Sequence, residues 1–208
     1  VAKRTKQLAN TLTALGVQQG ENIATLAWNG YRHVEIYYAV SGMGAVVHTL
    51  NPRLFPEQLV YIINHAKDTM VFFDSTFAPL VKAIAPACPT VKRWVQMCDE
   101  AAMPAEPAVA GCLNYEALIK DASEQYVWPQ LDENAASGLC YTSGTTGNPK
   151  GALYSHRSTV LHAMAACTPD ALGLSSRDTI LPVVPMFHVN AWGIPYIALM
   201  TGAKMVMP

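Results

Sequence analysis

The spacing of apolar and polar residues predicts strands and helices that alternate along the first hundred residues. Short apolar runs rich in β-branched and aromatic residues predict strands at 22–28, 46–50, 70–74 and 91–97. Helical spacing predicts helices from the first residues to about Leu15, over 31–43, from Pro56 to about Ala66 and over 77–85. This order is typical of an α/β fold with a largely parallel sheet and flanking helices. Residues 99–111, rich in Pro and Ala and without periodicity, predict a surface excursion.

A second run of elements begins near residue 132. It comprises predicted strands at 137–142, 151–155, 178–184 and 203–208 and predicted helices at 156–171 and about 190–201. We therefore predict a first α/β subdomain over 1–131 and the start of a second over 132–208. Because the chain opens inside a helix and stops directly after a strand, we expect both subdomains to be incomplete at these ends.

The composition narrows the function classes. Charged residues make up 14% of the chain, against roughly 25% in an average soluble domain. With 51% hydrophobic residues the chain can bury a core, which argues against disorder, and a net charge of −1 argues against a nucleic-acid partner. The low charge predicts that apolar residues near the end, such as Ile197, Met205 and Val206, are exposed or packed against a neighbouring chain.

The cysteines and the beginning of the chain indicate the compartment. Five cysteines at wide, irregular spacing, without a CxxC pair, favour reduced thiols over disulfides or zinc. We find no signal-peptide pattern and no run of about 18 apolar residues that would span a membrane. A cytoplasmic location is therefore the expectation.

A glycine-rich loop carries the chemistry of the second half. Residues 141–151 read YTSGTTGNPKG. Gly144 and Gly147 let the backbone approach a ligand and turn its N–H groups toward an anion. Hydroxyl groups that can bind phosphate or a hard cation come from Thr142, Ser143, Thr145 and Thr146. Lys150 adds a positive charge, so the segment predicts a triphosphate or pyrophosphate cradle.

Two other readings of this loop fit less well. A merely flexible surface loop does not require Pro149-Lys150-Gly151 or strand patterns on both sides. The common P-loop, GxxxxGK[ST], requires glycine where Pro149 stands and Ser or Thr where Gly151 stands. The alternation that follows Lys150 also predicts a strand rather than a helix.

The string YTSGTTGNPKG resembles the phosphate loop of the adenylate-forming, AMP-binding enzymes, which include acyl-CoA synthetases, luciferase-type enzymes and peptide-synthetase adenylation domains. The segments 4–29, 45–54 (AVVHTLNPRL) and 183–193 (VVPMFHVNAWG) extend the resemblance over essentially the whole chain. It is nearest to medium- and long-chain fatty acyl-CoA synthetases. The resemblance implies a truncated part of the large N-terminal domain of such an enzyme.

The resemblance also implies roles for individual residues. Nucleotide contacts fall on Thr142, Ser143, Gly144, Thr145, Thr146, Gly147, Lys150 and His188. Of these, Lys150, His188 and Thr142 take catalytic roles, and Thr142 is also a candidate Mg²⁺ ligand. Taken alone, His188 is more often a structural histidine; in this family the matching residue lies where ATP meets the carboxylate. Trp192, otherwise a core aromatic, matches the residue that gates the acyl tunnel.

The chain has no acidic residue after Asp178 that could pair with a substrate ammonium group, so an alkyl or aryl acid fits better than an amino acid. The implied function is ATP-dependent activation of a fatty acid to acyl-AMP and then acyl-CoA, with ATP, Mg²⁺ and coenzyme A. We expect this segment alone to be inactive, because the family's later motifs for Mg²⁺, ribose and a catalytic lysine do not occur in it. An aryl or other carboxylate–CoA ligase, a non-catalytic nucleotide- or acyl-binding module and a luciferase-like relative stay open, as do a homodimer and peripheral membrane contact through a lipid substrate.

Overall fold

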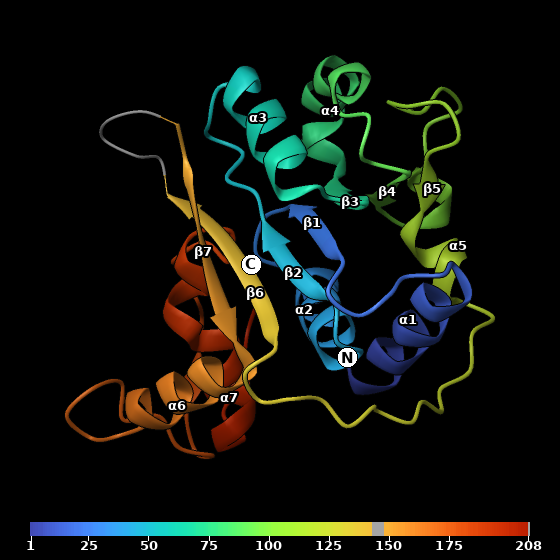
Figure 1. Ribbon diagram of the computed structural model, residues 1–208. Helices are drawn as coiled ribbons and strands as arrows, with labels where there is room; N and C mark the ends of the chain where they lie inside the picture. Colours follow the sequence, from blue (N-terminus) through green and yellow to red (C-terminus); the bar gives the residue numbers. More distant parts are fainter. Residues whose placement is uncertain (143–147, 208) are drawn as a thin grey trace.

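A computed structural model describes residues 1–142 and 148–207 and confirms the α/β fold with a largely parallel sheet. Seven strands form the central sheet in the order β5-β4-β3-β1-β2-β6-β7 (Figure 1). They are β1 (Asn22–Leu26), β2 (Val46–Thr49), β3 (Met70–Asp74), β4 (Arg93–Met97), β5 (Leu113–Asn114), β6 (Ala136–Thr142) and β7 (Lys150–Ser155). All neighbours are parallel except β6 and β7, which form an antiparallel pair.

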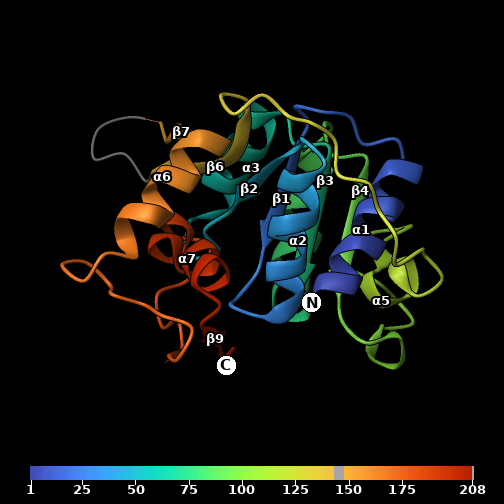
Figure 2. The ribbon, with the colours of Figure 1, turned by 90° about the horizontal axis from the view of Figure 1, so that it is seen from below.

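Helices cover both faces of the sheet. They are α1 (Ala2–Ala14), α2 (Tyr31–Gly42), α3 (Pro56–Ala66), α4 (Ala78–Ile84), α5 (Tyr115–Ile119), α6 (His156–Ala166) and α7 (Ile194–Thr201). Short 3-10 turns lie at Ser75–Phe77, Ala85–Ala87 and Glu100–Ala102. Helices α3 and α4 lie on one face, and α1, α2 and α5 on the other, while α6 and α7 lie beside β6 and β7 (Figures 1 and 2). No helix in the described part of the chain is long and apolar enough to cross a membrane.

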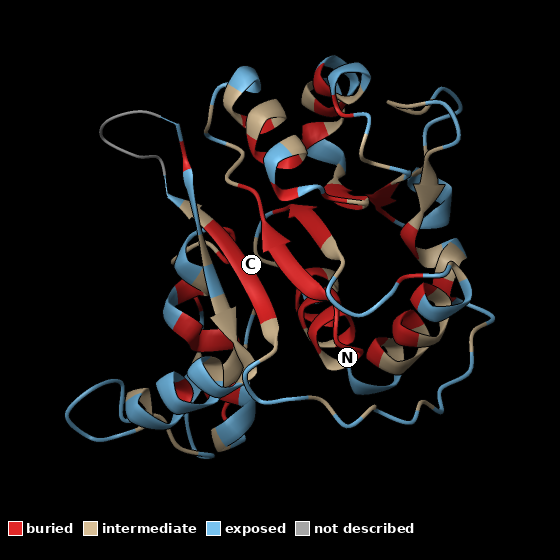
Figure 3. Cartoon of the chain, viewed as in Figure 1, coloured by how far each residue is buried: buried red, intermediate tan, exposed pale blue. Residues whose placement is uncertain are grey.

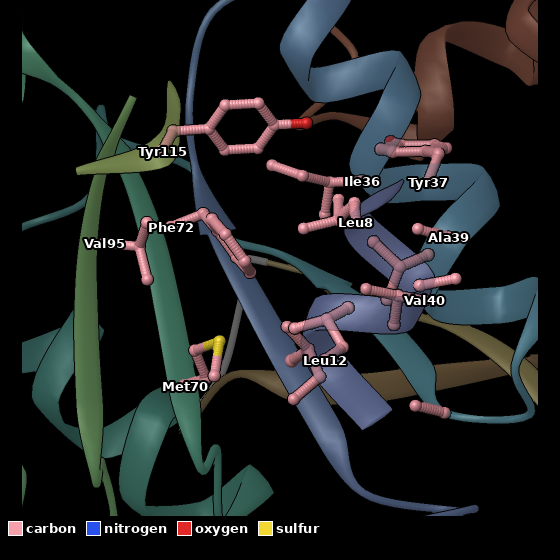
Figure 4. Close-up of a cluster of buried hydrophobic side chains, with 14 of the residues drawn as sticks. Leu8, Leu12, Ile36, Tyr37, Ala39, Val40, Met70, Phe72, Val95 and Tyr115 are labelled. Atoms are coloured by element: carbon pink, nitrogen blue, oxygen red, sulfur yellow. The ribbon is translucent and has the colours of Figure 1, made fainter. Parts of the chain in front are cut away.

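The two larger apolar cores of the described residues form because alternate side chains of a strand point to opposite faces of the sheet. In β3, Met70 and Phe72 join the core under α1, α2 and α5, whereas Val71 and Phe73 join the core under α3 and α4. Figure 4 shows the first core, with Leu8 of α1 among its side chains. Strands covered on both sides are buried along their length (Figure 3), which explains the near-continuous apolar runs of the sequence.

The sequence-based boundaries hold best in the first half. The predicted excursion over 99–111 is confirmed as mostly exposed chain with one short 3-10 turn. Directly after it, β5 and α5 were not predicted, since two and five residues are too few to show periodicity. The two predicted subdomains share the sheet, because β2 pairs with β6. The division near residue 132 itself stays a prediction.

The last elements are shorter than predicted. Helix α6 ends at Ala166 instead of about 171, because Pro169 disfavours helical backbone at the residue before it. The strand predicted over 178–184 is reduced to β8 (Thr179–Ile180), since prolines such as Pro182 cannot donate to a ladder. It pairs in parallel with β9 (Lys204–Met205) in a separate sheet, and α7 begins at Ile194 rather than near 190.

One exposure prediction is wrong. Ile197 is fully buried, because α7 packs against α6 and turns this side chain inward. Met205 is half-buried and Val206 is 39% exposed. The exposed apolar side chains of this region lie instead on the outer surfaces of the two helices, at positions such as Leu161, Met164, Leu199 and Met200.

Candidate functional site

The β6–β7 hairpin positions the two ends of the glycine-rich loop. Thr142, the last residue of β6, is the register partner of Lys150, the first residue of β7. The Thr142 hydroxyl donates a hydrogen bond of 3.4 Å to the Lys150 carbonyl oxygen, and both residues are exposed. Because a strand follows Lys150, the loop differs from the common P-loop, which leads into a helix. The remaining predicted loop residues lie outside the described part of the chain: Ser143, Gly144, Thr145, Thr146 and Gly147.

Tyr141 ties the loop end of this hairpin to α3. Its hydroxyl lies 2.6 Å from Nδ1 of His65, and its ring centroid is 5.2 Å from that of His48. A Cβ atom at Gly151 would lie 3.1 Å from the Tyr141 ring, so glycine lets the tyrosine pack across its partner strand. Partial burial raises the pKa of Tyr141, which therefore stays a neutral hydrogen-bonding group near pH 7.

A buried histidine–aspartate pair lies below Tyr141. His48 Nδ1 is 2.9 Å from both carboxylate oxygens of Asp68, and both side chains are fully buried. Burial raises the pKa of Asp68, although the neighbouring His48 opposes the shift. The pair ties β2 to the turn after α3 and so fixes the strand next to β6.

A cavity of about 130 Å³ brings two predicted site residues together. Thr142 and His188 both line it, and Asn51, from the loop after β2, lies on the same wall. The cavity lies where the parallel strands end at their carboxyl edge, the usual ligand position in open α/β sheets. Lys150 is not among the residues that line it.

Within the described part of the chain, the residues around Thr142 supply no carboxylate for Mg²⁺. The 130 Å³ cavity has the Thr142 hydroxyl but no lining carboxylate, and Mg²⁺ is normally held by one or two carboxylates. No cluster of three or more His, Cys, Asp or Glu residues suited to a metal occurs within 1–142 and 148–207. Thr142 as a metal ligand therefore gains no support from these residues.

A second cavity, of about 350 Å³, adjoins the first between β7, α6 and α7. The two cavities share Tyr154 and Val189 as lining residues. Its other lining residues include Ser158, Thr159, His162 and Tyr196. Trp192 lines neither cavity and is 58% exposed, so its gate role stays a prediction.

The backbone from 189 to 193 forms a left-handed turn beside both cavities. Positive φ angles run from 47° at Val189 through 56° at Trp192 to 77° at Gly193. Such backbone strains residues other than glycine, and most of all a β-branched one. The turn explains why the helix predicted from about 190 begins only at Ile194.

Buried polar groups hold this turn from the side of the sheet. The Tyr37 hydroxyl of α2 donates to the Met186 carbonyl oxygen at 2.6 Å, and its oxygen also lies 3.1 Å from Oδ1 of Asn190. The Cys140 thiol of β6 also reaches Asn190 Oδ1, at 3.3 Å. Burial raises the pKa of both Tyr37 and Cys140, which keeps them protonated donors.

Sequence reasoning assigned no individual role to several residues of the site: Tyr37, Asn51, Tyr141, Tyr154, His162 and Val189. Asn51 carried a usable signal, since it directly follows a predicted buried strand and so falls at the carboxyl edge. The sequence offers no such signal for Tyr37 and His162, because each contacts the turn at a residue far away in sequence. The separation is 153 residues for Tyr37 and Asn190 and 30 residues for His162 and Trp192.

The chain belongs to the AMP-binding enzyme family, which it matches over residues 1–208. It is 56% identical over 208 residues to a medium-chain-fatty-acid–CoA ligase of Ectopseudomonas oleovorans, covering 100% of this chain and 38% of that protein. It is 55% identical over 210 residues to a 3-methylmercaptopropionyl-CoA ligase of Ruegeria pomeroyi, again covering 100% and 38%. The chain thus spans about 38% of the length of these curated relatives.

Solved structures agree on the fold. The inhibitor-bound N-terminal domain of FACL13 from Mycobacterium tuberculosis superimposes with a TM-score of 0.85 at 25% identity. The match covers 99% of this chain and 48% of that one. The likeness supports the assignment of the chain to the N-terminal part of this family's fold.

Proposed function

We propose that the complete protein activates a medium- or long-chain fatty acid with ATP, forming acyl-AMP and pyrophosphate, and then transfers the acyl group to coenzyme A. The observation that carries the proposal is the meeting of Thr142 and His188 in one cavity that adjoins a second, larger one. The first cavity would hold the reacting carboxylate and phosphate, and the second would receive the tail of the acid.

The chemistry assigns a task to each residue. The carboxylate attacks the α-phosphate of ATP, pyrophosphate leaves, and the coenzyme A thiol later displaces AMP. Charge builds on phosphate oxygens in the first step, so preorganised donors stabilise its transition state. We assign Thr142, Lys150 and the loop residues Ser143, Gly144, Thr145, Thr146 and Gly147 to the phosphates. His188 would lie near the α-phosphate and the carboxylate.

Relatives support this substrate class. The E. oleovorans relative is named for medium-chain fatty acids, and a Thermus thermophilus relative, 49% identical over 208 residues and covered to 37%, for long-chain ones. The R. pomeroyi relative, named for 3-methylmercaptopropionyl-CoA, favours a short thioether acid as the second candidate. Ser158, Thr159 and His162 make part of the second cavity polar, which suits that alternative.

The proposal also covers the location, the metal ion and the domain organisation of the enzyme. We propose a cytoplasmic protein in which Mg²⁺ accompanies ATP, with residues 1–131 and 132–208 as parts of two subdomains. A homodimer and peripheral contact with a membrane through the lipid substrate belong to the same proposal. We expect the 208-residue segment alone to form no acyl-CoA.

The test uses the complete protein and a series of straight-chain acids together with 3-methylmercaptopropionate. AMP release is measured with and without coenzyme A, and adenylation by pyrophosphate exchange. Thr142→Ala should lower adenylation about 10²-fold, the scale for loss of one preorganised donor. Thr168→Ala, an exposed threonine outside both cavities, serves as the matched control. A wild-type protein that releases no AMP with any acid would refute the function; a near-wild-type Thr142→Ala rate would refute only the assignment of Thr142.

A further inference from the structure

The left-handed turn 189–193 has a hydrogen-bond partner on the side of α6 as well as the one from Tyr37. Nε2 of His162 lies 3.1 Å from the Trp192 carbonyl oxygen. Because a carbonyl can only accept, the imidazole donates this hydrogen bond from Nε2. The bond joins the middle of α6 to a residue of the turn that has a positive φ.

Gly193 lets the imidazole reach that position. A Cβ atom at Gly193 would lie 2.8 Å from Cδ2 and 2.9 Å from Nε2 of His162, closer than real contacts allow. Gly193 also has a φ of 77°, which other residues adopt only with strain. Glycine at this position therefore permits both the bend of the backbone and the close approach of the ring.

The turn supplies one of the residues in the wall between the two cavities. Val189, its first residue, lines both of them, as does Tyr154 of β7. Tyr154 belongs to a strand of the sheet, whereas Val189 depends on a strained backbone with a φ of 47°. Of the two shared residues, Val189 is thus the one whose position can change when the turn changes.

We propose that His162 is a positioning residue: by holding the Trp192 carbonyl it keeps the turn left-handed and so keeps Val189 in the wall between the two cavities. The proposal rests on the proposed function, in which the acid's carboxylate and tail occupy these cavities. His162 touches neither reacting group, but it also lines the second cavity, so the effect on the turn is separated from direct contact with the acid's tail by a measurement made without substrate. Loss of its hydrogen bond should therefore affect the binding of the acid more than that of ATP.

The first experiment measures steady-state kinetics of the complete protein with His162→Leu, which lacks a donor, and His162→Gln, whose amide keeps one. In His162→Leu the KM for the acid should rise about 3- to 10-fold, the effect of losing one ordinary hydrogen bond, while the KM for ATP changes less than about 2-fold. In His162→Gln the KM for the acid should return most of the way to the wild-type value. His156→Gln, a histidine at the first residue of the same helix, is the matched control.

The second experiment needs no substrate and so separates this proposal from the proposed function. The protein is labelled with 5-fluorotryptophan, and the ¹⁹F signal of Trp192 is assigned with Trp192→Phe. His162→Leu should shift or broaden that signal, His162→Gln should restore it, and the signals of Trp94 and Trp128 should stay in place as evidence of folding. An unmoved Trp192 signal, an unchanged KM for the acid, an equal rise in the KM for ATP, or a His162→Gln that behaves like His162→Leu would each overturn the proposal.

Discussion

Removing the Tyr37 hydroxyl tests whether the buried restraint on the turn stabilises the fold. The hydroxyl of this fully buried side chain donates to the Met186 carbonyl oxygen and also lies 3.1 Å from Asn190 Oδ1. In Tyr37→Phe, Asn190 keeps its contact with Cys140, but the Met186 carbonyl loses a short hydrogen bond of 2.6 Å. A buried polar group left without its partner costs about 1–3 kcal/mol, so we expect a loss of about 2 kcal/mol.

The assay combines thermal unfolding with hydrogen exchange. In a domain of 150–250 residues, about 2 kcal/mol corresponds to a fall in Tm of roughly 4–8 °C. Exchange should quicken at amides of the turn, such as that of Ala191, which bonds to the His188 carbonyl at 3.0 Å. Tyr38→Phe is the matched control, since its hydroxyl donates to a backbone carbonyl from a half-buried side chain and should cost less. If Tm falls by less than about 1 °C and exchange is unchanged, the turn does not depend on Tyr37.

Two further predictions concern buried ionisable groups. Burial lowers the pKa of fully buried His33 to about 4, below its ordinary 6.5. As the pH falls, His33 therefore takes up a proton in the unfolded chain before it does so in the folded one. The stabilisation that comes from neutral, buried His33 is complete above pH 6.5, and about 3 kcal/mol of it is lost as the pH falls toward 4. The free energy of unfolding, measured with urea across this pH range, should fall with pH more steeply in the wild type than in His33→Gln. Equal slopes in the two proteins would contradict the prediction. Glu35, fully buried, accepts hydrogen bonds from Arg4 and Tyr115 at 2.8 and 2.9 Å, and Glu35→Gln should cost about 2 kcal/mol by the same assay. Lys3→Gln, at an exposed ion pair, is its control and should change stability by less than about 1 kcal/mol; equal losses would contradict the role of burial.

The fold was predictable where local pattern and burial agree. Strands β1, β2 and β3 are buried on both faces, so each appeared in the sequence as a largely apolar run bounded by turn residues. Pro56 marked the first residue of α3 correctly, because proline suits the first turn of a helix. Alternation also predicted the strand that follows the loop, whereas its antiparallel pairing with β6 was not predicted.

The turn at 189–193 could not be predicted from local sequence. Nothing in Val189-Asn190-Ala191-Trp192 favours a positive φ except the asparagine, and only distant partners hold that backbone in place. The same holds for Ile197, whose burial depends on how α7 packs against α6. Both cases show tertiary contacts overriding what composition suggested for the last segment.

The position of the candidate site follows from one property of the sheet. Strands β1, β2 and β6 are parallel neighbours, so the segments after β2 and β6 emerge at the same edge. Asn51 and Thr142 are 91 residues apart in sequence and reach one cavity for this reason. His188 reaches it by a different route, because Tyr37 of α2 binds the backbone at Met186 and the side chain of Asn190 on either side of it. The sheet therefore sets where the loop residues meet, whereas the hydrogen bonds of the turn set whether His188 joins them.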